Sequence, residues 1–201
     1  MVETREASSL LHGDLGVSLP LPTAGRAIRV VPGLRILSLR HLPGGAAALN
    51  AAVAAHGLTP LPEPGTFRGA DPWLLWVAPA ELLLLTTSSA VADGVLQALT
   101  PGREALACVL DQSAGCLVIE LKGDAVADVL LHLLDVSAVP QQPGRGTRTR
   151  LMDVGAVVLR LETDRVFLVM DRAHGVYVAQ WIKHALGAEG PVSDVLSCAR
   201  R

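Results

Sequence analysis

Two stretches of similar design decide the fold: RILSLR (35–40), which leads through Gly44-Gly45 into AAALNAAVAA (46–55), and CLVIEL (116–121), which leads through Gly123 into DAVADVLLHLL (124–134). In each, a strand-like apolar run is followed by glycine and then by a helix-like segment. The pattern predicts that the chain builds a strand and a helix twice in the same order.

The two stretches begin longer units that also correspond to each other. The first unit runs from about 34 to 99 and the second from about 116 to 186. The later part of the first, ELLLLTTSSAVADGVLQAL (81–99), resembles that of the second, RVFLVMDRAHGVYVAQWIKHAL (165–186). This self-similarity predicts an α+β fold of two related β-α-β-β-α halves, with antiparallel or mixed sheets and helices packed on them.

Composition along the chain predicts where these halves begin and end. Residues 1–26 are rich in Ser, Gly and Pro without a sustained period, which predicts an N-terminal arm. We expect the first α+β half over 27–112, the second over 113–187, and a C-terminal tail over 188–201.

Local patterns place individual elements inside the halves. Ala92, Val95, Leu96 and Leu99 recur at helical spacing, which predicts a helix over about 89–99. The turn Ala78-Pro79-Ala80 separates two short apolar runs, which predicts a pair of strands on either side of it.

The overall composition favours a protein partner. Half of the residues are hydrophobic and 18% are charged, against about 25% charged in an average globular domain. The apolar surplus indicates a face buried against another chain, and a densely packed Ala, Leu and Val core is the alternative. A net charge of −2 argues against nucleic acid, and the apolar runs fall short of the roughly 20 residues needed to span a membrane.

The sequence shows no motif for a cofactor or a metal. Gly144-Arg145-Gly146 follows a loop and precedes a strand-like run, whereas a dinucleotide-binding turn lies between a strand and a helix. The six histidines form no metal-binding pair. Cys108, Cys116 and Cys198 have neither metal nor redox spacing, which favours reduced thiols and a cytoplasmic location. We therefore expect no catalytic, cofactor-binding or metal-binding residue in this chain.

Asp111 and Ser113 could be interpreted as part of a nucleophilic site. Two residues apart in a strand, they would share a face, but a base such as histidine would still be needed. The favoured interpretation is that both side chains hydrogen-bond to the backbone and fix the turn before Cys116.

Arg145, Arg148 and Arg150 form the polar cluster most typical of a functional surface. If Arg148 and Arg150 lie in a strand they share a face, and Arg145 could reach it from the preceding loop. Guanidinium groups suit carboxylates or phosphates, so a subunit contact is expected here ahead of a ligand, and a solvated hairpin is the alternative. Trp73 and Trp76 are further candidates for the subunit interface.

Several segments resemble a known family in their order and spacing. They are LLWVAPAELLLL (74–85), Asp111–Ser113 followed by LKGDAVADVLL (121–131), PGRGTRTRL (143–151) and 157–181. Together they are similar to the gamma subunit of heterotetrameric sarcosine oxidase, a member of the wider folate-binding, aminomethyltransferase-like superfamily. The resemblance covers roughly residues 34–186.

The resemblance implies a non-catalytic small subunit of a multisubunit, flavin-dependent amine oxidoreductase. Such a subunit packs against larger flavoprotein subunits and stabilises them. FAD, FMN, NAD and tetrahydrofolate would then belong to those partner subunits, and none would be bound by this chain alone. The alternative is a free-standing folate-binding, aminomethyltransferase-like protein.

Overall fold

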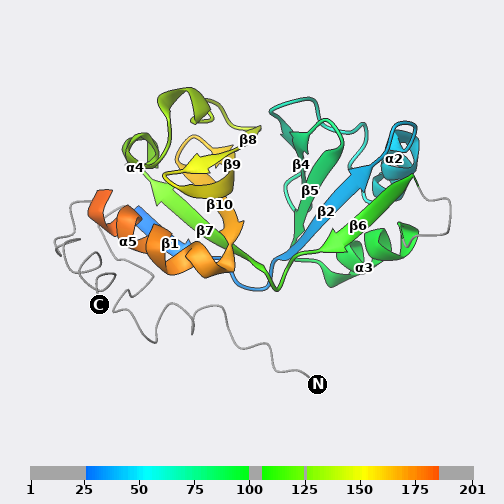
Figure 1. Ribbon diagram of the computed structural model, residues 1–201, viewed down its shortest axis with the longest axis horizontal. Helices are drawn as coiled ribbons and strands as arrows, with labels where there is room; N and C mark the ends of the chain where they lie inside the picture. Colours follow the sequence, from blue (N-terminus) through cyan, green and yellow to red (C-terminus); the bar gives the residue numbers. More distant parts are fainter. Residues whose placement is uncertain (1–25, 100–105, 125, 186–201) are drawn as a thin grey trace, which may run out of the picture.

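A computed structural model describes residues 26–99, 106–124 and 126–185 (Figure 1). The expected C-terminal tail and all but the last residue of the expected N-terminal arm lie outside these ranges. Within them the chain forms two five-stranded sheets, in which every strand pairing is antiparallel, and four α-helices. The expected α+β class with antiparallel sheets is confirmed. No described helix has the length and apolar character needed to cross a membrane.

The first sheet has the strand order β3-β4-β5-β2-β6 and carries helices α2 and α3. Its elements are β2 (Arg35–His41), α2 (Ala46–Ala54), β3 (Phe67–Arg68), β4 (Trp73–Ala78), β5 (Glu81–Thr86), α3 (Ser89–Ala98) and β6 (Ala107–Asp111). Helix α3 begins where the Ser88 side chain accepts a hydrogen bond from the Val91 N–H, at 3.3 Å.

The second sheet has the order β1-β7-β10-β9-β8 and carries helices α4 and α5. Its elements are β1 (Arg26–Val30), β7 (Cys116–Gly123), α4 (Val126–Leu133), β8 (Arg145–Leu151), β9 (Val154–Glu162), β10 (Arg165–Asp171) and α5 (Gly175–Ala185). Short 3₁₀ turns follow α4 at Val136–Ala138 and precede α5 at Arg172–His174.

Three strands separate the two helices of each sheet, so the predicted β-α-β-β-α order is one strand short. In the first sheet the additional strand is β3, which spans only two residues and lies in a segment rich in proline and glycine. Strand β1 precedes the first sheet in the sequence but pairs with β7 of the second. Local hydrophobic patterns carry no information on such a distant pairing.

The two sheets face each other, with the helices on the outer sides (Figure 1). An apolar cluster that includes Leu75 and Leu83 of one sheet and Leu159 and Phe167 of the other fills the space between them. Two further clusters lie beneath α2 and α3 and beneath α4 and α5. The apolar surfaces of both sheets are therefore buried on both sides, which explains the continuous apolar runs in the sequence.

At one margin the two sheets are joined through the backbone of their edge strands. The Phe67 N–H donates to the Gly144 carbonyl oxygen at 3.0 Å, and the Gly146 N–H donates to the Gly65 carbonyl oxygen at 3.1 Å. A Cβ atom at Gly146 would lie 2.5 Å from Leu75 Cδ1. A side chain at this position would require the buried Leu75 to move, because β8 lies so close to β4.

Candidate functional site

Glu81 is the centre of a charged cluster that includes one of the predicted interface arginines. Arg148 in β8 donates to both carboxylate oxygens of Glu81 in β5, at 3.0 and 2.9 Å. Arg40 and Ser38, both in β2, donate to Glu81 Oε1 at 3.3 and 3.2 Å. The Glu81 side chain is only 12% exposed. Three strands from two sheets thus meet at one carboxylate.

The ionised form of Glu81 is the stable one in this setting. Burial by itself raises the pKa of Glu81, but the hydrogen bonds from Arg148 and the charges of Arg148 and Arg40 outweigh it. The net pKa of Glu81 therefore lies below its ordinary value. A carboxylate held in this way is suited to an ion pair and poorly suited to accept a proton at neutral pH.

The structure separates the three arginines that the sequence places together. Arg148 and Arg150 alternate with Thr149 in β8 and share a face, as expected. Arg145 is three residues from Arg148 in the same strand, so it lies on the opposite face and does not join them. Strand β8 begins at Arg145, which was expected in the preceding loop, and this earlier start turns Arg145 to the opposite face.

Each of these arginines has a different environment. Arg150 forms only an exposed ion pair with Asp153, at 3.6 Å. Arg145 has no ion-pair partner within the described parts of the chain. It lines a pocket of about 360 Å³ between the Gly65 turn and residues 137–142, half of whose lining is polar. Arg145 and Arg150 are thus the members of the cluster that remain open to another chain.

The two candidate tryptophans lie on opposite faces of β4. Trp73 packs into the cluster between the sheets and makes an edge-to-face contact with Phe167, with ring centroids 5.4 Å apart. Trp76 packs against the cluster beneath α2 and α3. Both rings are half-buried, so each contributes to the core and presents part of its surface.

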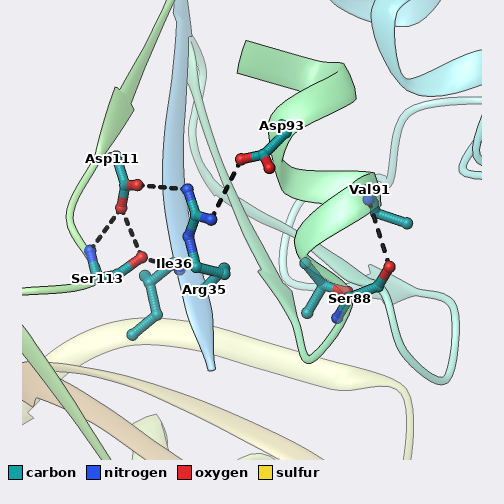
Figure 2. Close-up of polar contacts among 8 residues, drawn as sticks. Arg35, Ile36, Ser88, Val91, Asp93, Asp111 and Ser113 are labelled. Carbon is teal, nitrogen blue, oxygen red and sulfur yellow. Dashed lines mark hydrogen bonds and ion pairs between the residues drawn. The ribbon is translucent and has the colours of Figure 1, made fainter. Parts of the chain in front are cut away.

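Asp111 and Ser113 fix a turn, as the favoured interpretation predicts. Asp111 accepts from the Ser113 N–H at 2.9 Å and from its hydroxyl at 2.5 Å. The Ser113 hydroxyl in turn accepts from the Ile36 N–H at 2.9 Å. Figure 2 shows Arg35 between Asp111 and Asp93, with ion-pair distances of 2.7 and 3.2 Å. The Ser113 hydroxyl therefore bonds to the backbone of β2, and the Asp111 carboxylate is paired with Arg35.

The pKa of Asp111 agrees with this structural role. Burial raises the pKa of Asp111, and the hydrogen bonds from Ser113 and Arg35 outweigh that effect and bring it below its ordinary value. The carboxylate therefore stays ionised and cannot serve as a base of useful strength near neutral pH.

Sequence reasoning missed a buried ionic group in the second sheet. Glu120 in β7 is buried and paired with Arg29 of β1 and with Arg165 of β10, the latter at 2.6 Å. Arg165 also lies 5.5 Å above the ring of Phe167. The sequence did offer a signal for this group, namely the single glutamate within the apolar run CLVIEL. A carboxylate buried in such a strand needs a cationic partner. The group ties three neighbouring strands together.

The structure also describes the surroundings of the other reactive side chains that the sequence singled out. Among the described residues, no three His, Cys, Asp or Glu side chains gather at a site that could hold a metal ion. Cys108 and Cys116 are free thiols, and burial raises the pKa of Cys116, which disfavours the thiolate. Gly144 precedes β8 and Gly146 lies inside it, so this Gly-Arg-Gly sequence leads into a strand, as predicted.

The described residues define an α+β protein of two facing antiparallel sheets whose buried charges hold strands together. No protein-family model and no curated protein sequence matches the chain. Among solved structures, it is similar to a chain of the heterotetrameric sarcosine oxidase from Corynebacterium sp. U-96 in complex with pyrrole 2-carboxylate. The two share 26% sequence identity over 92% of this chain and 93% of that one, with a TM-score of 0.70.

A second solved structure shares the fold at lower sequence identity. It is the glycine cleavage system aminomethyltransferase T from Bartonella henselae, with 14% identity and a TM-score of 0.60. The match covers 79% of this chain and 45% of the aminomethyltransferase, so this chain corresponds to less than half of that protein. This likeness shows the fold alone.

Proposed function

We propose that this chain is a non-catalytic, gamma-type subunit of a multisubunit, flavin-dependent, sarcosine oxidase-like amine oxidoreductase. The observation that carries the proposal is the match to a chain of a heterotetrameric sarcosine oxidase over nearly the full length of both chains. The subunit packs against larger flavoprotein subunits and stabilises them. FAD, FMN, NAD and tetrahydrofolate are carried by those partners, where the substrate is oxidised.

The arrangement of polar groups supports a structural role. Glu81, Asp111 and Glu120 each have arginine partners that join strands. Ser113 is the residue that the sequence offered as a nucleophile, and its hydroxyl instead forms hydrogen bonds that fix a turn. We further infer that the two sheets arose by duplication, since each contains the same succession of a strand, a helix, three strands and a helix. With free thiols at Cys108 and Cys116, we place the complex in the cytoplasm.

We place contacts with the large subunits at Arg145, at Arg150 and at the exposed parts of Trp73 and Trp76, which lie on different faces of β8 and β4. Arg148 shares a face of β8 with Arg150, but its guanidinium is held by Glu81. Reversing the charge with Arg145→Glu and Arg150→Glu should weaken assembly and leave the isolated fold intact. The control is Lys122→Glu, at an exposed cation of β7. Equal assembly of all variants would show that Arg145 and Arg150 do not contribute to the interface.

The proposed function is tested by affinity capture of the full chain from its native cell extract. The captured chains are identified by mass, and a visible absorption spectrum is recorded. A yellow assembly that contains larger chains and oxidises a methylated amine is the expected result. A colourless monomer would overturn the proposal, and titration with tetrahydrofolate would then test the free-standing aminomethyltransferase-like alternative.

A further inference from the structure

Strand β6 forms an open edge of the first sheet. It pairs with β2 on one side, and none of the described strands pairs with its other side. The Leu42 N–H bonds to the Leu106 carbonyl oxygen at 2.7 Å, and the Gln112 N–H bonds to the Ile36 carbonyl oxygen at 2.8 Å. Because bonded pairs alternate along an antiparallel ladder, the even-numbered residues of β6 face β2, and Ala107 and Val109 direct their N–H and C=O groups outward.

An apolar surface lies beside this edge. Leu106 and Leu110 are 48% and 50% exposed and share one face of the extended segment, and Leu42 next to Leu106 is 61% exposed. These three residues are half of the six large apolar side chains that are exposed among the described residues. Such a concentration on one sheet edge is typical of a surface that another chain covers.

A pocket of about 640 Å³ adjoins the same surface and is lined mostly by apolar atoms. Its lining includes Leu42, Leu106, the turn Ala78-Pro79-Ala80, Arg40 and Glu81. An apolar side chain can be buried here while the main chain that carries it pairs with β6.

The charge at this site is unbalanced. Glu81 is the single carboxylate among the residues that line the pocket, and Arg148 already engages both of its oxygens. Arg40 therefore has one contact to Glu81, at 3.3 Å, and keeps unused guanidinium donors at a half-exposed position. The site carries one excess positive charge, which a carboxylate on an incoming chain would neutralise.

We propose that the outer edge of β6 receives an extended segment of a large subunit, with apolar side chains that cover Leu106 and Leu110 and a carboxylate that binds Arg40. The segment adds a strand to the first sheet through Ala107 and Val109. This inference rests on the proposed function and specifies which surface and which kind of partner segment it uses.

Hydrogen–deuterium exchange on the native complex tests the edge pairing directly. The amides of Ala107 and Val109 should exchange at least tenfold more slowly in the complex than in the isolated chain. Unchanged exchange at these amides within an intact complex would overturn the inference and leave the proposed function standing. If the isolated chain self-associates in sedimentation and already protects these amides, the occupant is a second copy of the chain, which also overturns it.

A pair of matched variants tests the apolar surface. Leu110→Glu in β6 and Leu131→Glu in α4 change leucines of equal exposure, 50% and 51%. Leu110→Glu should reduce the recovery of large subunits at least tenfold, because the new carboxylate is unfavourable under apolar side chains and repels the carboxylate of the partner segment. Leu131→Glu should have no effect. The melting temperatures of both isolated chains are measured to show that each folds.

The charge of Arg40 is tested separately. Arg40→Glu should weaken assembly at least tenfold, whereas Arg40→Lys, which keeps the charge, should restore most of it. Equal loss in both variants would contradict the carboxylate contact. If the unaltered chain recovers no large subunits at all, the proposed function itself fails. If the unaltered chain and the variants recover them equally, only the present inference fails.

Discussion

Arg148 of β8 and Glu81 of β5 form a two-point ion pair that connects the two sheets, with donor–acceptor distances of 3.0 and 2.9 Å. The residues are 67 positions apart in the sequence. Glu81 shares a face of β5 with Leu83 and Leu85, which belong to the apolar cluster between the sheets. The pair therefore fixes how the sheets lie against each other.

Removal of this ion pair should destabilise the isolated chain. Arg148→Met leaves the largely buried Glu81 carboxylate with only Arg40 and Ser38, so the free energy of unfolding should fall by about 1–2 kcal/mol. The half-exposed position of Arg148 keeps the loss at the lower end of values for buried pairs. Denaturant titration measures it.

Arg150→Met is the matched control for that measurement. Arg150 lies in the same strand and on the same face, but its contact with Asp153 is 3.6 Å long and exposed. Its removal should change the free energy of unfolding by less than about 0.5 kcal/mol. Equal losses in the two variants would contradict the role given to the Glu81 ion pair.

The close approach of β8 to β4 gives a second prediction. Gly146→Ala should lower the free energy of unfolding by about 1–3 kcal/mol, because its Cβ would overlap Leu75 Cδ1 at 2.5 Å and approach the Val158 carbonyl oxygen at 3.1 Å. Gly155→Ala is the control, since a Cβ there meets nothing within 4 Å. Thermal unfolding of both variants should show a loss at position 146 and little change at 155.

Local elements were predictable because their signals are local. The helices α2 and α3 and the strands β4 and β5 follow from apolar spacing and from the turn at Pro79. The turn fixed by Asp111 and Ser113 was also predictable, since Asp111 accepts from Ser113, two residues further along the chain. In these cases, the interaction partners are sequence neighbours.

Distant partners account for what the sequence could not predict. The pairing of β1 with β7 brings Ile28 opposite Leu121, and no periodic pattern specifies that choice. The separation of Arg145 from Arg148 depends on where β8 starts, which a Gly- and Arg-rich segment leaves undefined. Glu81 and Glu120 were visible as acids in apolar strands, but their arginine partners lie 41 to 91 residues away in the sequence.

Stability should fall in acid because the three carboxyl groups that pair with arginines across strands have lowered pKa values. The pKa values of Glu81, Asp111 and Glu120 lie below their ordinary ones in the folded chain. Their contribution is complete above the ordinary carboxyl pKa of about 4 and is lost as the pH falls through the lower folded-state pKa. The melting temperature should therefore be steady near neutral pH and decline below about pH 4.

The buried Glu120 allows this pH dependence to be assigned. Glu120→Gln should lower stability at pH 7 and make the decline in acid shallower, because one titrating group is removed. Glu162→Gln removes an exposed carboxylate that binds the same Arg165, and it should leave the decline nearly unchanged. An equally steep decline in Glu120→Gln would show that Glu120 does not contribute.

Ser113→Ala separates a structural role from a catalytic one. The Ile36 N–H loses its acceptor and Asp111 loses a donor, so the free energy of unfolding of the isolated chain should fall by about 1–2 kcal/mol. Turnover by the assembled oxidoreductase should remain within about twofold of the unaltered complex, measured at equal content of this chain. A loss of about a hundredfold, the scale of a general acid–base contribution, would instead assign chemistry to this hydroxyl.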